Sequence, residues 1–517
     1  MDDGALTRAL MHGAAYPHAA PGVRCIETHL SRVFLAGEYA YKVRKPVRFD
    51  FVDFSTLAAR RADCEEELRL NRRLAGALYL DVVPIAAVAG GAGGHEDREA
   101  DGNTPVRLGG SGPALDYAVR MRRFAQHDLL AARVQAGNVD GAMMDALGRR
   151  LADFHADAPR SGSTDATDYG TPARVAATLE ECLQGVARLA DADGAEAIQC
   201  LGRAMRSEAL RLAPAMAARR RSGHVRECHG DLHLGNVVVV DGEALPFDCL
   251  EFNAGLRWID SISDTAFLYM DLIHHGRRDL AYRFLNAYLE RGGDYAGLGL
   301  LPFYAALRAL VRARVGLERR HQCAAAGAAA APAAGWRALL ELAETLLSRR
   351  RGAILLMHGL SGSGKSTVAA RLAERGGMVR VRADVERKRP GAPPAGGWYA
   401  PAAGAATYRR LLAACRLGAC AGFPMIADAT FLARARRECF AAQAARLRLP
   451  FVIVHCEATV DTLRARISAR AQARNDPSDA DLEVLGRQLR EQEPLCAAEL
   501  RATTSASDAD TLAARFA

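Results

Sequence analysis

The segment GAILLMHGLSGSGKSTVAARLAE, residues 352–374, decides the fold of the second half of the chain. It contains the spacing GxxxxGK[ST], whose fixed positions are here Gly359, Gly364, Lys365 and Ser366. The preceding residues, 353–358, form a short apolar run typical of a buried strand, and the residues that follow, 367–375, favour a helix. A strand, a glycine-rich loop and a helix in this order are what the motif requires. The sequence therefore predicts a phosphate-binding loop.

This loop supplies the first candidate binding residues. Glycines let backbone N–H groups surround phosphate oxygens, and the N-terminus of the following helix adds the positive end of its dipole. Lys365 is expected to reach the β- and γ-phosphates of ATP, and the Ser366 hydroxyl to bind Mg²⁺. The predicted ATP-binding residues of the loop are Gly359, Ser361, Gly362, Ser363, Gly364, Lys365, Ser366 and Thr367.

Polar residues follow two further apolar runs. Residues 378–381 lead to Asp384, and residues 424–427 lead to Asp428, while residues 451–456 predict a third strand. In open α/β sheets ligands bind beyond the carboxyl ends of the strands. Asp384 would accept a substrate proton or position the acceptor, and Asp428 would act on the magnesium shell. Each aspartate has a structural alternative as a helix N-cap, where Asp is favoured.

Three arginines recur at four-residue spacing, which places them on one face of an expected helix. They are Arg466, Arg470 and Arg474. They would close over ATP as a lid, or they form a solvated charged face, which is common in an arginine-rich protein. The pattern favours neither reading over the other.

The stretches GLSGSGKST, RADVERKR, ADATF and LRARISAR give the span 353–495 a family resemblance. It resembles the small P-loop kinases of the gluconokinase, polynucleotide 5′-kinase and zeta-toxin group of AAA family ATPases. In polynucleotide-kinase-like members an Asp followed three positions later by Arg handles the acceptor hydroxyl. Asp384 and Arg387 have that spacing. The resemblance implies phosphoryl transfer, although related domains also serve as ATPases or regulators.

A second constellation lies in CHGDLHLGNVVVVDGEALPFDCLEFN, residues 228–253. It contains the pattern HxDxxxxN, with Asp248 further along, and the four residues are His229, Asp231, Asn236 and Asp248. This spacing suits phosphoryl transfer, in which one Asp accepts or orients the proton of the acceptor hydroxyl while an Asn and a second Asp hold Mg²⁺. The Asp241-Gly242 pair predicts a hairpin turn that would bring Asp248 back beside Asn236.

Two other interpretations of this segment remain open. His229, Asp231 and His233 alternate along the chain and would serve as ligands of a transition metal. No further His or Cys partner is evident at short spacing, however, and the metal interpretation leaves Asn236 and Asp248 without a role. The other interpretation is a polar loop with a purely structural function.

The same constellation resembles the aminoglycoside phosphotransferase and protein-kinase-like superfamily, more weakly over residues 25–320. The resemblance implies that Asp231 is the catalytic Asp and that Asn236 and Asp248 bind the metal. The segment FLAGEYAYKVRK offers Lys42 as the lysine that contacts phosphate, with Lys45 as runner-up. The segment CEEELRLN offers Glu67, and less well Glu66, as its ion-pair partner. The sequence MRRF, residues 121–124, lies where the interlobe hinge would line an adenine pocket.

The segment departs from that superfamily in two respects. No GxGxxG loop precedes Lys42, and no aminoglycoside pocket is recognisable. Such a pocket is usually acidic, and the chain after Asp248 offers several acids that would equally serve as helix caps and ion pairs: Glu251, Asp260, Asp264 and Asp271. The superfamily resemblance therefore does not name the substrate.

The choice of basic residues supports two of these assignments. The chain has 68 basic residues, and only four of them are lysines: Lys42, Lys45, Lys365 and Lys388. A lysine retained in such an arginine-dominated chain is a candidate for a site that needs a compact ammonium instead of a planar guanidinium. Lys42 and Lys365 are the lysines that the two motifs select.

The length of 517 residues and a hydrophobic fraction of 50% predict more than one globular domain. We expect a kinase-like domain at 1–322, an alanine-rich linker and helix at 323–350, and a P-loop kinase-like domain at 351–517. The predicted fold class is α/β and α+β: an N-terminal two-lobe protein-kinase-like fold and a C-terminal parallel α/β sheet flanked by helices. Residues 89–112, which are rich in glycine, predict a long loop.

These observations predict a cytoplasmic ATP-dependent phosphotransferase with two ATP/Mg²⁺ sites and a small-molecule hydroxyl as acceptor. No apolar run is long enough to cross a membrane, and no secretory signal is apparent. The net charge of +8 suits phosphate-bearing ligands without demanding nucleic acid. A regulatory ATP-binding protein or ATPase, and a nucleic-acid end kinase through the C-terminal domain, stay open as alternatives. The sequence identifies neither the acceptor nor the oligomeric state.

Overall fold

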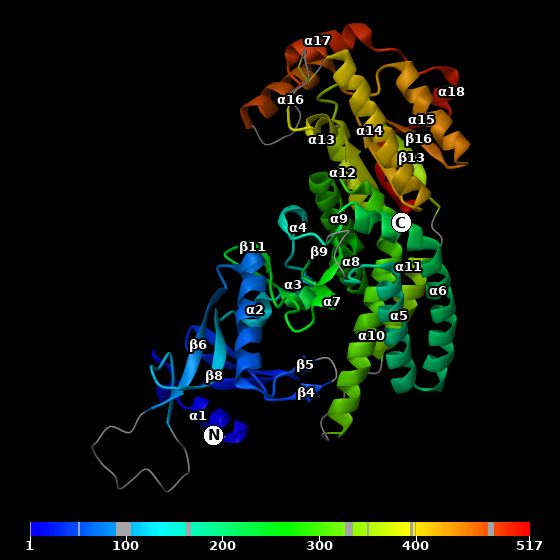
Figure 1. Cartoon of the computed structure of the whole chain (residues 1–517). Helices are drawn as coiled ribbons and strands as arrows, with labels where there is room; N and C mark the ends of the chain where they lie inside the picture. Colours follow the sequence, from blue (N-terminus) through cyan, green and yellow to red (C-terminus); the bar gives the residue numbers. More distant parts are fainter. Residues whose placement is uncertain are drawn as a thin grey trace, which may run out of the picture. The chain divides into compact units, whose positions relative to one another are not determined.

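The computed structural model describes residues 2–49, 52–88, 105–161, 167–325, 334–348, 351–392, 397–398, 400–473 and 480–516. The chain packs as two compact units, and each is built from several stretches of sequence (Figure 1). The first unit comprises Met1–Asn138, Asp157–Gly170 and Arg219–Asp264. The second comprises Val139–Ala156, Thr171–Ala218 and Thr265–Ala517.

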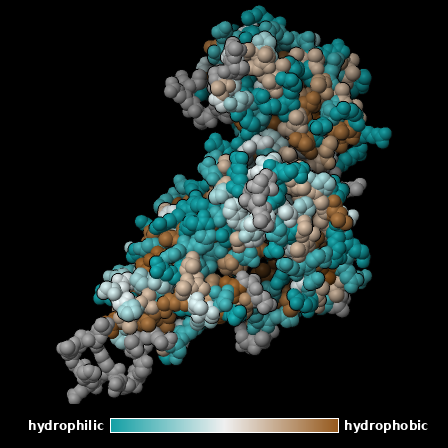
Figure 2. All heavy atoms as spheres, in the orientation of Figure 1, coloured by the Kyte–Doolittle hydropathy of each residue, from teal (hydrophilic) through white to brown (hydrophobic). Residues whose placement is uncertain are grey.

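The face of the described chain drawn in Figure 2 is largely polar. Figure 2 shows charged and polar residues over most of the face drawn, with apolar residues scattered between them. Within the described residues every helix is too short or too polar to cross a bilayer.

An antiparallel sheet of six strands forms the centre of the first unit, in the order β1-β2-β3-β8-β6-β7. In chain order its strands are β1 (Arg24–Glu27), β2 (Ser31–Ala36), β3 (Tyr39–Arg44), β6 (Tyr79–Ala87), β7 (Val106–Leu108) and β8 (Ala114–Arg122). β2 and β3 pair antiparallel as a hairpin. The strand β7 corrects the prediction of one long loop at residues 89–112, because a run of three residues pairs with β6 despite the glycines around it. Residues 89–104 of that predicted loop lie outside the described residues.

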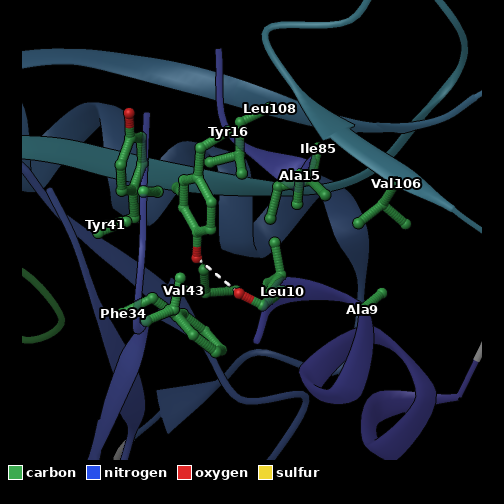
Figure 3. Packing of buried hydrophobic residues seen from close by; sticks show 14 of the residues in the cluster. Ala9, Leu10, Ala15, Tyr16, Phe34, Tyr41, Val43, Ile85, Val106 and Leu108 are labelled. Carbon is green, nitrogen blue, oxygen red and sulfur yellow. Dashed lines mark hydrogen bonds between the residues drawn. The ribbon is translucent and has the colours of Figure 1, made fainter. Parts of the chain in front are cut away.

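A small apolar core covers one face of this sheet (Figure 3). It joins side chains of β2, β3, β6 and β7 to the N-terminal elements α1 (Asp3–Leu10) and η1 (Gly13–Ala15). The Tyr16 hydroxyl donates a hydrogen bond of 2.8 Å to the Leu10 carbonyl, which satisfies a polar group inside the core. This packing fixes β3, the strand that carries Lys42.

Helix α2 (Leu57–Ala75) packs against β6 and β8. Thr56 caps its first turn by accepting a hydrogen bond from Ala59 N. The remaining elements of this unit are β4 (Arg48–Phe49), β5 (Val52–Asp53), η2 (Gln126–Asp128), α3 (Leu130–Gln135), β9 (Val225–Glu227), η3 (Leu234–Asn236), β10 (Val237–Val240), β11 (Glu243–Pro246), α7 (Ala254–Arg257) and β12 (Trp258–Asp260). β9 pairs with β12, and β10 pairs with β11.

The second unit begins with a set of helices. They are α4 (Gly141–Asp157), α5 (Pro172–Leu189), α6 (Ala192–Arg221), α8 (Ser261–His274), α9 (Arg278–Gly292), η4 (Tyr295–Gly299), α10 (Leu301–Ala325) and α11 (Ala334–Leu347). α10 packs against α5 and α11. Residues 326–333 of the predicted linker lie outside the described residues, so its structure and the predicted domain boundaries stay predictions.

A parallel sheet of five strands follows in the second unit, in the order β14-β15-β13-β16-β17. Its strands are β13 (Ala353–His358), β14 (Val379–Arg382), β15 (Pro424–Asp428), β16 (Phe451–His455) and β17 (Thr503–Ser505). All residues of β13 are buried, as the uninterrupted apolar run predicts for a central parallel strand. The accompanying helices are α12 (Lys365–Gly376), α13 (Ala383–Lys388), α14 (Pro401–Cys420), α15 (Arg434–Arg446), α16 (Val460–Ala473), α17 (Leu482–Glu491), α18 (Ala497–Leu500), η5 (Ala506–Asp508) and α19 (Ala509–Ala514).

This strand order positions the glycine-rich loop. β13 lies between β15 and β16, and the connections from β13 run first to one side of the sheet and later to the other. The carboxyl end of β13 is thus the point at which the chain changes direction, where open α/β sheets form their ligand crevice. The predicted phosphate-binding loop leaves β13 at this point and enters α12.

Candidate active sites

The first candidate site centres on the ammonium group of Lys42. Its Nζ lies 2.9 Å from Glu67 Oε1 and 2.7 Å from Asp248 Oδ1. Lys42 comes from β3, Glu67 from α2 and Asp248 from the end of the β10–β11 hairpin. The Lys42 ammonium therefore contacts both Glu67 and Asp248, and all three residues were predicted from separate segments of the sequence. The runner-up residues lie elsewhere: Lys45 pairs with Glu27, and Glu66 with Arg69 and Arg257.

Arg44 completes this cluster and was missed by the sequence analysis. Its Nη2 lies 2.6 Å from Glu67 Oε2 and 2.5 Å from Glu251 Oε1, and its Nε donates to Asp63. The Arg44 side chain is only 1% exposed, and Glu67 is fully buried. Both cations of β3 thus hold the same carboxylate, each at a different oxygen.

The cluster contains more negative than positive groups. Its cations are Lys42 and Arg44, and its carboxylates are Asp63, Glu67, Asp248 and Glu251. Burial raises the pKa of Glu251 to about 7, although Arg44 opposes this shift. Desolvation acts against the charged form of Asp248 too, but Lys42 outweighs it and lowers the pKa of Asp248. The excess negative charge is what a divalent cation would neutralise.

The HxDxxxxN segment forms a tight loop that holds its own polar groups. Asn236 Nδ2 donates to the backbone carbonyl and to Oδ2 of Asp231, both at 3.0 Å. Asp264 accepts hydrogen bonds from the backbone N–H groups of His229 and Gly230, at 3.0 and 2.9 Å. The loop is thereby anchored to the start of α8, and the predicted catalytic and metal-binding residues are brought together.

The geometry of His229 argues against the transition-metal interpretation. Its Nε2 donates to the Phe247 carbonyl at 2.9 Å, and its Nδ1 accepts from the Asp231 N–H at 3.3 Å. Burial lowers the pKa of this imidazole, in keeping with a neutral ring that donates at one nitrogen and accepts at the other. Both ring nitrogens form hydrogen bonds within the loop. The ring therefore stabilises the loop and has no free lone pair for a metal.

The predicted hairpin accounts for the return of Asp248. β10 and β11 pair in register through Val240 and Glu243, so the turn consists of Asp241 and Gly242. Their φ angles are 51° and 82°, as a two-residue turn with both central residues in the left-handed region requires. Asp248 itself has a φ of 63°, an uncommon conformation for a residue other than glycine.

The acids that follow Asp248 are occupied within the protein. Glu251 pairs with Arg44, Asp260 pairs with Arg219 at 2.7 Å, and Asp264 caps the loop described above. In the structure these three acids therefore form ion pairs or cap a loop, which is the alternative to an acidic substrate pocket.

The second candidate site is built by the glycine-rich loop. Gly359, Gly362 and Gly364 have φ angles of 139°, 84° and 91°, in the region where only glycine is free of strain. A Cβ on Gly359 would lie 2.2 Å from the Cys456 carbonyl oxygen, so the loop also needs glycine for space. The motif is thus accompanied by the backbone conformation that exposes its N–H groups.

One cavity of about 290 Å³ gathers most residues predicted for this second site. Its lining includes Ser361, Gly362, Gly364, Lys365, Ser366, Thr367, Asp384, Arg387, Asp428, Arg466 and Arg470. Gly359 and Ser363 do not line this cavity, and Arg474 lies outside the described residues. The lining further includes Arg382, Tyr408, Thr430, Arg487 and Gln488, which the sequence analysis missed because single residues outside a motif carry no signal.

Several donors of this cavity are occupied by the protein itself. Lys365 Nζ donates to the Leu360 carbonyl at 2.7 Å, and the Gln488 side chain accepts from Ser361 N at 2.9 Å. Arg387 pairs with Asp384 at 2.5 Å, which unites the two residues predicted to handle the acceptor. Burial lowers the pKa of Lys365.

Asp428 offers an oxygen to this cavity. The residue is 6% exposed, and among the described residues its Oδ2 has no hydrogen-bond partner. A buried carboxylate oxygen without a donor is costly unless a cation or water satisfies it. The position at the end of β15 and this free oxygen fit a group in the magnesium shell.

Comparison with known proteins places these two sites in known families. The profile of the "Phosphotransferase enzyme family" matches residues 40–301, more than half of the chain, and includes Lys42, Asp231 and Asp248. The chain belongs to the phosphotransferase enzyme family. The profile of an AAA domain matches residues 354–495 of this phosphotransferase and includes the glycine-rich loop. The two matches make the chain an ATP-dependent kinase with a P-loop kinase-like domain, and they confirm the predicted fold classes.

Relatives of this phosphotransferase match it over most of its length. Uncharacterized proteins of Mycobacterium tuberculosis and Mycobacterium bovis are 35% identical to it over 468 residues, which cover 88% of either chain. The similarity therefore covers most of both chains.

Solved structures resemble parts of the phosphotransferase at lower identity. A choline/ethanolamine kinase family protein from Mesorhizobium loti is 14% identical, with a TM-score of 0.39, over 66% of this chain and 95% of its own. A gluconokinase from Sinorhizobium meliloti is 21% identical, with a TM-score of 0.24, over 33% of this chain and 95% of its own. Likeness at this level leaves the acceptor of the phosphotransferase open.

Proposed function

We propose that this phosphotransferase has two ATP/Mg²⁺ sites and transfers the γ-phosphate of ATP to a hydroxyl group of a small molecule. The observation that carries the proposal is the position of Lys42 Nζ between Glu67 and Asp248. A lysine fixed by a buried glutamate beside a metal-binding aspartate is the arrangement that positions ATP phosphates in kinase-like enzymes.

The charge of the first site supports magnesium as its cofactor. Lys42 and Arg44 leave an excess of carboxylates, and Asp248 keeps its side chain 43% exposed while pairing with Lys42. Oxygen ligands from Asp248 and Asn236, together with phosphate oxygens, are a set that Mg²⁺ accepts. The metal would bring positive charge to the phosphates, and Lys42 would hold them in place.

Asp231 is the proposed catalytic residue of this site. Its carboxylate is 31% exposed, so an acceptor hydroxyl has access to it, and Asn236 Nδ2 fixes one of its oxygens. A carboxylate within hydrogen-bond reach of a hydroxyl orients it for in-line attack and takes its proton as the new bond forms. Removing the carboxylate charge should therefore slow transfer much more than it weakens ATP binding.

An apolar cluster next to Lys42 suits the adenine ring. Met121 and Tyr79 are buried there with Leu245, and Phe124 packs edge-on against Phe247 at a centroid distance of 5.2 Å. Nucleotide pockets are mostly apolar, with polar groups placed at the reacting end. We propose that residues 121–124 line the adenine side of the first site, as the family resemblance implies.

In the second site we propose that the glycine-rich loop binds phosphates and that Ser366 and Asp428 hold Mg²⁺. Asp384 would orient the acceptor, with Arg387 holding its carboxylate in place. Arg466 and Arg470 line the same cavity and would complete the phosphate contacts. The proposed domains are residues 1–322 and 351–517, joined by the linker and helix at 323–350.

The deciding experiment incubates the purified full chain with γ-labelled ATP, Mg²⁺ and a small-molecule cell extract, and separates the labelled products. Asp231→Asn tests the first site, with Asp241→Asn as its control, because Asp241 lies in the nearby hairpin turn, where Asn is equally tolerated. Lys365→Ala tests the second site, with Arg375→Ala as its control on the same helix, where Arg375 is 59% exposed.

A labelled product that disappears in one test variant and persists in its control would support a kinase and assign the active site. Free phosphate as the sole product in every sample would replace this proposal with an ATPase or a regulatory protein. A parallel sample with a 5′-hydroxyl oligonucleotide tests the remaining alternative, since end phosphorylation lost in Lys365→Ala would identify a nucleic-acid kinase.

A further inference from the structure

A second cavity lies within the second unit, outside both candidate active sites. Its volume is about 530 Å³, and its lining residues come from α4, α9, α12, β14 and the region of α13. A cavity of this size accommodates a small metabolite. None of the residues predicted from the two motifs lines it.

Direct packing holds the two sides of this cavity together. The buried Asn286 of α9 donates to the Met378 carbonyl at 2.9 Å and accepts from Arg380 N at 2.7 Å. The Asn286 side-chain amide thus donates one hydrogen bond to the backbone at the edge strand β14 and accepts one from it, as the backbone of a neighbouring strand would. On this side the cavity is therefore bounded by α9 and β14, which pack directly against each other.

The lining of this cavity is strongly cationic. Seven cations face three carboxylates: Arg149, Arg283, Arg291, Arg380, Arg382, Lys388 and Arg389 against Asp145, Glu290 and Glu374. Arg291 and Arg389 have further partners in Asp153 and Glu386, which lie behind the lining. Cations therefore outnumber carboxylates among the residues that line the cavity. Like charges gathered around one cavity raise the local affinity for anions.

Arg380 is incompletely satisfied at the centre of this lining. Its Nη1 lies 3.2 Å from the Ser366 carbonyl and its Nη2 lies 3.3 Å from Glu290 Oε2, both near the upper limit of a hydrogen bond. Its Nε is buried and has no partner among the described residues. A guanidinium with these long contacts and an unpartnered donor can bind an oxyanion such as phosphate through two parallel hydrogen bonds.

We propose that this cavity is a binding site for a small phosphate-bearing metabolite, held by Arg380 inside and Arg149 at the exposed rim. The excess of cations over carboxylates in this lining suits a phosphate monoester, which carries about 1.5 to 2 negative charges near neutral pH. An oxyanion at Arg380 would accept a hydrogen bond from the unpartnered Nε and would compete with Glu290 for the same guanidinium.

Occupancy of this site is coupled to the glycine-rich loop. Arg380 contacts the carbonyl of Ser366, a residue that lines the nucleotide cavity, and Arg382 lines both cavities. A ligand that draws Arg380 or Arg382 toward itself changes the surroundings of the first turn of α12. By linkage, the nucleotide must change the affinity for the metabolite by the same factor.

Isothermal titration of the full chain tests the site, with both nucleotide sites first saturated with a non-hydrolysable ATP analogue and Mg²⁺. The probes are glucose 6-phosphate and inorganic phosphate, with glucose as the uncharged comparison. Glucose 6-phosphate and phosphate are expected to bind saturably and glucose not to bind. Equal binding of glucose, or no saturable binding of either anion, would overturn the proposal.

Two variants assign the binding to this cavity. Arg149→Gln and Arg380→Gln should each weaken binding of glucose 6-phosphate about tenfold or more, because each removes a charged donor. Arg416→Gln on the exposed side of α14 makes the same charge change outside the cavity and should leave binding unaltered. Arg149 is exposed, so its replacement leaves the fold intact even if Arg380→Gln destabilises it. Unchanged binding in Arg149→Gln and Arg380→Gln would refute this location.

The coupling has its own measurement. In a Lys42→Ala background, titration with the ATP analogue reports the glycine-rich loop alone. Saturating glucose 6-phosphate is expected to shift that affinity by about fivefold or more, the lower end of ordinary coupling between sites. An unshifted affinity would contradict the coupling, and binding of glucose 6-phosphate that disappears in Lys365→Ala would place the anion in the nucleotide cavity instead.

Discussion

Arg44 holds Glu67 at the carboxylate oxygen that Lys42 leaves unbound, with Arg44 Nη2 lying 2.6 Å from Glu67 Oε2. The two cations alternate along β3 with Val43 between them, so their side chains leave the same face of the strand. Glu67 is therefore fixed at both oxygens before any nucleotide arrives. The orientation of Lys42 depends on an arginine that does not itself contact the ammonium.

Arg44→Gln should destabilise the first unit strongly. The change leaves buried carboxylates of Asp63, Glu67 and Glu251 without their shared partner, and breaking a buried pair in this way costs about 3–5 kcal/mol. The free energy of unfolding and ATP binding at the first site should both fall. Arg61→Gln on α2 is the matched control, since Arg61 is 57% exposed and its pair with Glu65 contributes little. Equal stability of the two variants would contradict this role for Arg44.

Glu251→Gln should change the pH dependence of stability. Burial raises the pKa of Glu251 to about 7 from an ordinary value of 4.5. Because the folded value is the higher one, the stabilisation is fully present below the ordinary value and is lost as pH rises through about 7. Gln does not titrate, so the wild type should lose stability relative to Glu251→Gln between pH 5 and pH 8, by at most about 3 kcal/mol. Melting temperatures of both proteins across this range test the expectation, and parallel curves would contradict it.

Gly359→Ala should abolish nucleotide binding at the glycine-rich loop. The φ of 139° strains any side chain, and the added Cβ would meet the Cys456 carbonyl oxygen. Gly404→Ala, a glycine inside α14 with open space around its Cα, is the control and should be neutral or slightly stabilising. Titration with a fluorescent ATP analogue in a Lys42→Ala background separates the two variants. Retained binding in Gly359→Ala would show that the loop conformation is not required.

Asp428→Asn should separate metal binding from nucleotide binding at the second site. The change keeps the size of the side chain but removes the charge of an oxygen that has no partner among the described residues. Affinity for the ATP analogue without Mg²⁺ should be kept, while the gain on adding Mg²⁺ should shrink about tenfold or more. Asp510→Asn, an exposed residue that pairs with arginines of α12, serves as control. An unaltered magnesium gain would remove Asp428 from the metal shell.

The sequence predicted both sites through residues that belong to fixed spacings. Lys365 and Asp231 lie within motifs, and Lys42 was recognisable because lysine is rare in this chain. Arg44 could not be found in this way, since one arginine among many carries no signal and its role depends on three carboxylates from distant segments. Its partner Glu251 was noted only as one acid among several.

The fold was predictable where apolar periodicity is strong. β13 is an uninterrupted buried run, and the Asp241-Gly242 turn has a conformation that few residue pairs adopt. β17 was missed because its three residues, Thr503–Ser505, are short and polar, and they form a strand only by pairing with the edge of β16. The cavity around Arg380 was equally hidden, because its lining comes from five elements that meet only in three dimensions.

The scarcity of lysine has a practical consequence for this molecule. An amine-selective reagent finds only four side chains in the whole chain, and two of them, Lys42 and Lys365, are the ammonium groups at the two proposed nucleotide sites. Their side-chain and residue exposures are 14% and 8%, so labelling should be slow and should depend on whether phosphate covers the amine. The protein thus carries a natural footprinting tag at each site, and mass spectrometry of four peptides would report the occupancy of both sites from one sample.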